Sequence, residues 1–168
     1  PGAEAIRALL VTGDVGRWAA VTETLMHFAA RAEHVAETIE PAVSAGRWVI
    51  SDRFVDSTVA YQGNGLGVDR DFIAMLARKI CGDLVPDLTL MLDLPVEIGL
   101  ERAAQRRSGE DRYETMDRDF HERLRRGFHE IAAADPGRCV IVDATEDVET
   151  VAGRVREAVG TRLLVPAR

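Results

Sequence analysis

The amino-acid sequence predicts an α/β fold in which helices cover both faces of a parallel sheet. Three short apolar runs are typical of buried strands, namely residues 48–51, 88–94 and 139–142. Helical patterns fill the intervals between these runs, so right-handed crossover connections are expected. Three strands make a narrow sheet for such a three-layered fold, and we expect that N-terminal strands are absent from this chain.

Each predicted helix has its own apolar stripe or end signal. The longest stripe recurs at spacings of three and four, and Gly46 beyond it suits a helix end. Another helix is expected to begin near Pro95, a good first-turn residue. The remaining stripes are equally regular. The expected helices, in order, cover residues 21–39, 69–80, the segment from 95 onward, 116–131 and 148–159.

The position of the functional site follows from the predicted strands. Each strand reaches or meets an aspartate near its C-terminal end, and these residues are Asp52, Asp93 and Asp143. In open parallel sheets, ligands bind beyond the carboxyl ends of the strands. The site is therefore expected around Asp52, Asp93 and the loops that follow them.

Composition excludes some classes of partner. The 168 residues carry 21 Lys or Arg and 28 Asp or Glu, giving a net charge of −7. Non-specific nucleic-acid binding needs a surplus of basic residues, so it is not expected. The two isolated cysteines, Cys81 and Cys139, indicate a reducing compartment, and no apolar run is long enough to span a bilayer. We expect a single domain over residues 1–168 of a cytoplasmic protein, without membrane partners.

The most specific segment covers residues 52–63 and begins where a predicted strand ends. Arg53 can form a two-pronged, charge-assisted contact with a phosphate. Helical spacing then places four polar side chains on nearby faces of one short helix: Ser57, Thr58, Tyr61 and Gln62. Such groups suit a sugar and the edge of a pyrimidine. The alternative is a salt-bridged Asp52–Arg53 pair before a capped helix, but the whole string favours the site.

A second segment places His27 and Arg31 four residues apart, on one helix face. A ring and a guanidinium so placed could stack on a base and donate a hydrogen bond to its carbonyl. Phe28 lies between them and belongs to the apolar stripe. The alternative is an ordinary pair of solvated polar residues on an amphipathic helix.

A third segment, at about residues 105–115, has the composition of a mobile lid. Its arginines flank a polar loop that contains Gly109, and they are Arg106, Arg107 and Arg112. Arginines placed against a transferring phosphoryl group stabilise its charge. The alternative is a solvated charged loop.

Taken together and in this order, these segments resemble bacterial thymidylate kinases. Residues 1–10 are similar to the stretch that follows the family's Arg-Glu-Pro-Gly-Gly loop. Further likeness lies in residues 86–93, 120–123 and 142–144. The resemblance covers essentially the whole chain and implies a P-loop nucleoside monophosphate kinase-like fold.

The resemblance implies a role for each candidate residue. Arg53 and Arg7 would hold the monophosphate of dTMP, Arg31 would donate to a thymine carbonyl, and Tyr61 would pack on the deoxyribose. The full dTMP-binding set would be Arg7, His27, Arg31, Arg53, Ser57, Thr58, Tyr61 and Gln62. The catalytic set would be Arg53 with the lid arginines Arg107 and Arg112.

Two departures from the family pattern matter. The family places a phenylalanine, stacked on thymine, where this chain has His27. We expect His27 to stack, because the apolar stripe assigns Phe28 to the core, and its charge would then make dTMP affinity vary between about pH 5 and 8. The second departure is that no G-x-x-x-x-G-K-[ST] motif occurs in the sequence. That loop would supply ATP binding and magnesium positioning, so a chain beginning at Pro1 is expected to be inactive.

The expected function is phosphorylation of dTMP to dTDP by ATP with Mg²⁺, in dTTP synthesis. A homodimer is implied by the family, through the helix around residues 22–45. The alternatives are a related deoxynucleoside or nucleoside monophosphate kinase, or a non-catalytic nucleotide-binding fragment. No metal ligand is assigned within this chain.

Overall fold

The protein is described by a computed structural model over residues 2–14, 16–106 and 112–164. The first half is helical and consists of α1 (Gly2–Val11), α2 (Ala20–His34), η1 (Val35–Ile39), α3 (Glu40–Ser44), α4 (Val55–Thr58), η2 (Val59–Gly65) and α5 (Arg70–Cys81). The second half consists of β1 (Thr89–Asp93), α6 (Val96–Arg106), α7 (Arg118–Ala134), β2 (Cys139–Asp143), α8 (Val148–Val159) and η3 (Gly160–Leu164). The three η segments are π-helical.

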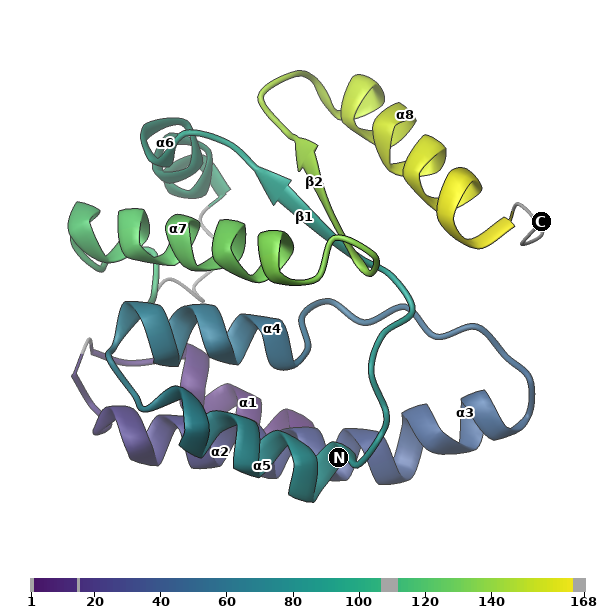
Figure 1. Cartoon of the computed structure of the whole chain (residues 1–168). Helices are drawn as coiled ribbons and strands as arrows, with labels where there is room; N and C mark the ends of the chain where they lie inside the picture. Colours follow the sequence, from purple (N-terminus) through teal and green to yellow (C-terminus); the bar gives the residue numbers. More distant parts are fainter. Residues whose placement is uncertain (1, 15, 107–111, 165–168) are drawn as a thin grey trace.

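Strands β1 and β2 pair in parallel, which confirms the predicted α/β class. Asp93 lies opposite Asp143 at their carboxyl ends. One face of this sheet packs on α7, where Met91 and Cys139 contact Ala132. Helix α8 lies on the other side of the strands from α7 (Figure 1). The described sheet is therefore the middle of three layers.

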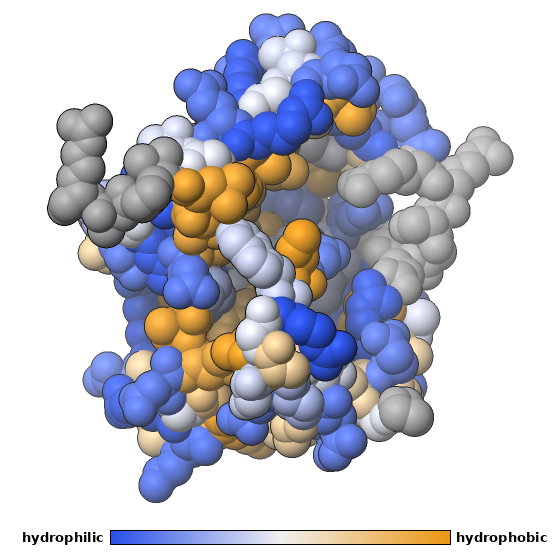
Figure 2. Space-filling model, turned by 90° about the vertical axis from the view of Figure 1, so that its right-hand side faces the viewer, coloured by the Kyte–Doolittle hydropathy of each residue, from blue (hydrophilic) through white to orange (hydrophobic). Residues whose placement is uncertain are grey.

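The predicted strand at residues 48–51 is wrong. This segment is extended, but within the described residues the sheet contains only β1 and β2. Trp48 is 67% exposed and Ile50 is 96% exposed. A strand needs the backbone groups of a neighbour as well as apolar side chains, and no described segment provides them here. Figure 2 shows apolar side chains gathered on the face along which the chain passes from α3 to α4.

The long predicted helix at residues 21–39 is α2 followed by η1, and only part of its apolar stripe is buried. Phe28 is 1% exposed and packs against α5. Val21 and Leu25, in contrast, are 51% and 47% exposed. The inward face of this first part of α2 carries Glu23 instead, which is 0% exposed. The apolar pattern predicted that Val21 and Leu25 face the core, but in this part of α2 the buried side chain is that of Glu23.

The other predicted helices are confirmed with small shifts at their ends. Asp69 and Asp147 accept hydrogen bonds from backbone N–H groups and so cap α5 and α8. The polar segment at residues 57–62 spans α4 and η2. Ala60 of η2 is 0% exposed and packs on Phe120 of α7, which fixes this segment against the rest of the domain. No helix in the described ranges is both long and apolar enough to cross a bilayer.

Candidate nucleotide site

Arg53 lies at the end of the extended segment, just before α4. Its φ angle is +71°, a left-handed conformation that costs a non-glycine residue about 1–3 kcal/mol. The Ser51 hydroxyl donates to the Arg53 carbonyl at 2.9 Å, and the Arg53 guanidinium carbon lies 4.8 Å from the centre of the Tyr61 ring. Asp52 and Arg53 form no ion pair with each other in the described structure. The exposed Arg53 side chain is thus held over Tyr61 rather than neutralised by its neighbour.

Arg31 of α2 is held between two aromatic rings. Its guanidinium carbon lies 4.7 Å from the ring centre of Phe28 and 5.4 Å from that of Phe54. Nη2 donates to the carbonyl oxygen of Phe54 and to Thr58 Oγ1, both at 3.0 Å. Nη1 is buried and has no hydrogen-bond partner among the described residues. Burial lowers the pKa of Arg31 from its usual value. The guanidinium is nevertheless held in place by Nη2, and Nη1 is left to donate to a ligand.

His27 lies beside Arg31 on the same helix. Its Nε2 is 3.0 Å from the hydroxyl oxygen of Tyr113, and the two rings are tilted by 31°. Burial lowers the pKa of His27 to about 4. The imidazole of the free protein is therefore neutral between pH 5 and 8, which argues against the expected dependence of dTMP affinity on the charge of this residue. Phe28 is in the core with Ile73, as its place in the stripe predicts.

Glu23 is a buried acceptor that the sequence analysis missed. Its Oε1 accepts from Gln62 Nε2 at 2.8 Å and from the Tyr113 hydroxyl at 2.6 Å. Its Oε2 accepts from Arg112 Nη2 at 2.5 Å. A signal was present, because Glu23 lies four residues before His27 and eight before Arg31, on one helix face.

The polar residues of α4 and η2 divide by burial. Thr58 and Gln62 are 2% and 1% exposed, whereas Ser57 and Tyr61 are half-buried. The Tyr61 ring meets Tyr113 edge to face, with ring centres 5.1 Å apart. Thr58 and Gln62 therefore connect this segment to α2, through Arg31 and Glu23 respectively.

The arginines of the predicted lid differ in where they lie. Arg107 is outside the described residues. Arg112 is 4% exposed, and its Nε and Nη1 donate to the carbonyl oxygens of Asp14 and Leu10 at 3.3 and 3.0 Å. Its Nη2 is paired with Glu23, so all three nitrogens have partners inside the protein. Arg112 was expected to act on the phosphates as a lid arginine, but in this structure its side chain is buried and paired with Glu23.

Arg7 and Asp93 are the remaining predicted groups. Arg7 is exposed on α1. Asp93, at the end of β1, accepts two hydrogen bonds from Arg125 at 2.8 and 2.9 Å, and Arg125 holds the pKa of Asp93 below its usual value. Asp93 therefore ties β1 to α7, and the candidate site is formed by α2, α4 and η2 rather than by the strand ends.

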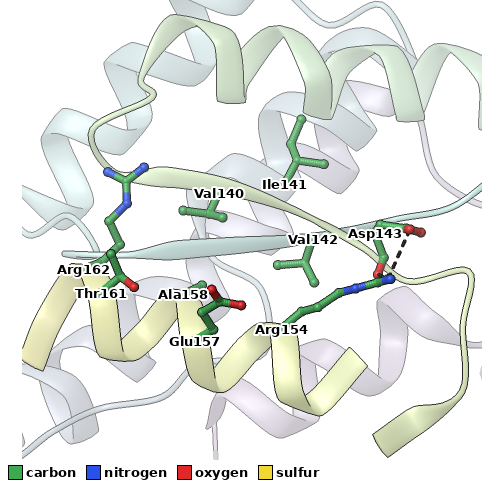
Figure 3. A pocket seen from close by; sticks show the side chains of 9 residues that line it. All are labelled: Val140, Ile141, Val142, Asp143, Arg154, Glu157, Ala158, Thr161 and Arg162. Atoms are coloured by element: carbon green, nitrogen blue, oxygen red, sulfur yellow. Dashed lines mark hydrogen bonds and ion pairs between the residues drawn. The ribbon is translucent and has the colours of Figure 1, made fainter. Parts of the chain in front are cut away.

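A pocket of about 300 Å³ lies elsewhere, between β2 and α8. Figure 3 shows Val140 and Val142 directed toward α8, with Arg154 paired to Asp143 at one end. None of the predicted site residues lines this cavity. We therefore place the candidate nucleotide site by its polar contacts and not by this cavity.

Comparisons with known proteins all point to one family. A thymidylate kinase family model matches residues 1–155. A thymidylate kinase of Rhodopseudomonas palustris is 51% identical over 172 residues, covering 100% of this chain and 74% of the relative. One from Caulobacter vibrioides is 48% identical over 163 residues, covering 97% and 78%. The crystal structure of thymidylate kinase from Ehrlichia chaffeensis superposes with a TM-score of 0.72 at 28% identity, covering 93% of this chain and 74% of that one. This chain belongs to the thymidylate kinase family.

Proposed function

We propose that the protein transfers the γ-phosphoryl group of ATP to dTMP and forms dTDP for dTTP synthesis. The observation that best supports a pyrimidine substrate is the unpartnered Nη1 of Arg31. A buried donor without an acceptor is costly, and a thymine carbonyl would satisfy it. Nη2 of Arg31 already donates hydrogen bonds to Phe54 and Thr58. The direction of Nη1 is therefore set before a ligand binds.

Arg53 would bind the 5′-phosphate. It is exposed, lies over Tyr61 and has no described carboxylate partner, so its guanidinium is available for a charge-assisted contact. Phosphoryl transfer is accelerated mainly by positioning and by charge stabilisation, and Arg53 would contribute both. Tyr61, beneath this guanidinium, would then lie against the deoxyribose, and Arg7 would add positive charge from α1.

The base pocket would be lined by Ser57, Thr58 and Gln62, with His27 at the stacking position. Thr58 and Gln62 are already hydrogen bonded within the protein, so their contribution is a fixed shape around the base. Arg107 would act on the phosphates as the lid arginine. Arg112 would instead support the pocket from behind, because its donors are taken by Glu23 and two backbone carbonyls.

The described residues do not form a metal site by themselves. In the ranges 2–14, 16–106 and 112–164, no group of three or more His, Cys, Asp or Glu side chains could hold a metal ion. Kinases bind Mg²⁺ mainly through substrate phosphates and one or two carboxylates. Mg²⁺ would therefore enter with ATP, where it neutralises phosphate charge.

The cytoplasm is the proposed location, in keeping with two free, buried cysteines.

A homodimer through α2 and α3 belongs to the same proposal. Val21 and Leu25 on α2 and Val43 on α3 are 51%, 47% and 50% exposed, which provides apolar surface for a second copy. Light scattering on the full-length protein, as it elutes from a size-exclusion column, should give twice the monomer mass. Leu25→Asp should give the monomer mass. A wild-type monomer at micromolar concentration would contradict this part of the proposal.

The base assignment is tested by calorimetry on the full-length protein with dTMP and dCMP. Cytosine carries an amino group in place of the carbonyl at the position that Arg31 would contact, so dTMP should bind more tightly. Arg31→Met should weaken dTMP binding about 10-fold or more, since a hydrogen bond from a charged group contributes roughly 1.5–3 kcal/mol. It should leave dCMP binding nearly unchanged. Equal losses for both ligands would favour one of the alternative functions, a kinase for other nucleotides or a non-catalytic binder.

A further inference from the structure

Five side chains that come from three parts of the chain meet in one buried network. Glu23 and His27 lie on α2, Gln62 lies on η2, and Arg112 with Tyr113 lies between α6 and α7. Glu23, Gln62 and Arg112 are 0%, 1% and 4% exposed. His27 and Tyr113 are half-buried, whereas Glu23, Gln62 and Arg112 cannot turn to bulk water. The hydrogen bonds of these three buried side chains are therefore directed by their neighbours within the protein.

The hydroxyl proton of Tyr113 lies between Tyr113 and Glu23. The two oxygens are 2.6 Å apart, and two oxygens this close repel unless a proton lies between them. Glu23 is the acceptor, because its other oxygen is paired with Arg112 and its Oε1 also accepts from Gln62. Burial raises the pKa of Tyr113 above its usual value, so Tyr113 retains this proton.

The hydroxyl of Tyr113 can then only accept from its remaining neighbours. Gln62 Nε2 donates to the Tyr113 oxygen at 3.3 Å, and His27 Nε2 lies 3.0 Å from the same oxygen. A bond between His27 and Tyr113 therefore requires the hydrogen on His27 Nε2. The neutral ring carries only one such hydrogen, so Nδ1 is left as a hydrogen-bond acceptor.

The charges around His27 keep the ring neutral. Glu23 favours protonation, but Arg31, Arg53 and Arg112 oppose it, and burial opposes it most. These groups come from α2, from the segment before α4 and from the segment before α7, and Tyr113 faces the ring with its oxygen. A protonated ring would need a second acceptor at Nδ1 in surroundings that already contain three guanidinium groups.

We propose that Glu23 is a positioning residue of the nucleotide site, which, by accepting the Tyr113 proton, holds His27 as the neutral tautomer protonated on Nε2. The consequence of this proposal rests on the proposed function. The His27 ring would be fixed in orientation, with Nε2 as donor and Nδ1 as acceptor, at the place where the base would bind. A fixed, neutral ring can lie against a neutral base without first losing rotational freedom or the hydration of a charge. Glu23 would act on the base only through Tyr113 and His27, without contacting the ligand itself.

The tautomer can be read directly from the ring nitrogens of His27. The experiment is long-range ¹H–¹⁵N NMR on the ¹⁵N-labelled full-length protein at pH 7, without ligand, with the His27 signals identified by their loss in His27→Phe. The expected result is a single form protonated on Nε2. A ring protonated on Nδ1, or on both nitrogens, would overturn the proposal. In Tyr113→Phe, which keeps the aromatic ring, the two tautomers should mix, and His34, His121 and His129 serve as internal controls.

Calorimetry with dTMP tests the positioning role separately. Tyr113→Phe should weaken dTMP binding about 3- to 10-fold, as expected for the loss of one hydrogen bond that orders a contact. Glu23→Gln should weaken it at least as much if that variant folds, and Tyr113→Phe decides the matter if it does not. Mixed tautomers with unchanged affinity would overturn the positioning role. If the wild type binds no dTMP, the proposed function fails, while the NMR result still decides the tautomer.

Discussion

Glu23 Oε2 and Arg112 Nη2 lie 2.5 Å apart in a buried ion pair between residues separated by 89 positions in sequence. The pair joins α2 to the segment that precedes α7, and the Glu23 side chain is 1% exposed. Breaking a buried pair by removing one partner leaves an uncompensated charge, which is far more costly than losing a pair in water.

Arg112→Ala should therefore lower the free energy of unfolding by about 3–5 kcal/mol, measured by urea denaturation. Arg118→Ala is the matched control, because Arg118 pairs with Glu97 on the surface with side chains 65% and 55% exposed. That variant should show a much smaller change. Similar losses for the two variants would contradict a buried role for Arg112.

His27 predicts a pH dependence of stability with a definite sign. Its pKa is about 4 in the folded protein and 6.5 in the reference state, so the unfolded chain takes up a proton that the folded protein does not. Stability should fall as the pH falls through this window, by about 2 kcal/mol between pH 8 and pH 5 from His27 alone. Urea unfolding of His27→Phe across this range should lack that part of the loss. His34→Phe, at an exposed position, should retain it.

The proposed contact between Arg53 and the phosphate of dTMP can be tested by binding measurements. Arg53→Ala should weaken dTMP binding at least about 10-fold in calorimetry, since a charge-assisted contact contributes roughly 1.5–3 kcal/mol. Thymidine, which has no phosphate, should bind Arg53→Ala as it binds the wild type. Because Arg53 has a φ of +71°, Arg53→Gly should be more stable than Arg53→Ala. Unchanged dTMP affinity in Arg53→Ala would remove Arg53 from the phosphate site.

Gly127 and Gly153 are both helical glycines and should respond to alanine with opposite signs. A Cβ at Gly127 would lie 2.6 Å from Cγ of Asn64, so α7 and η2 could not pack as closely. Gly127→Ala should cost about 1–3 kcal/mol of unfolding free energy. A Cβ at Gly153 of α8 meets no atom within 4 Å, and Gly153→Ala should stabilise by up to about 1 kcal/mol. Thermal denaturation shifts of the same sign would show that the packing of α7 on η2 is looser than described.

The sequence predicted those elements whose signals are local. Helices α5 and α8 have regular stripes and aspartate caps, and β1 and β2 are short apolar runs, so each could be located within a few residues. The segment at 48–51 has the same apolar character, but its strand state depends on a partner that local composition does not specify.

The sequence indicated the residues of the candidate site that would contact a ligand, but not the buried ion pair between Glu23 and Arg112 behind them. Arg31 and Arg53 were proposed as site residues because their spacing and neighbours match a known pattern. Glu23 was missed because an acidic residue on an apolar helix usually faces water, and its partners, Gln62 and Arg112, lie 39 and 89 residues away. The burial of Arg112 was not foreseen for the same reason, since a charged residue beside a polar loop gives no local sign of burial.

The proposed activity is tested by the rate at which the full-length protein forms dTDP from ATP and dTMP, with products separated by chromatography. Thymidine and dCMP serve as parallel acceptors at equal concentration. We expect dTMP to be the preferred acceptor, and Arg53→Ala to lower kcat/KM for dTMP at least about 10-fold. Preferred phosphorylation of thymidine, or a rate of dTDP formation that Arg53→Ala leaves unchanged, would rule out the proposed activity.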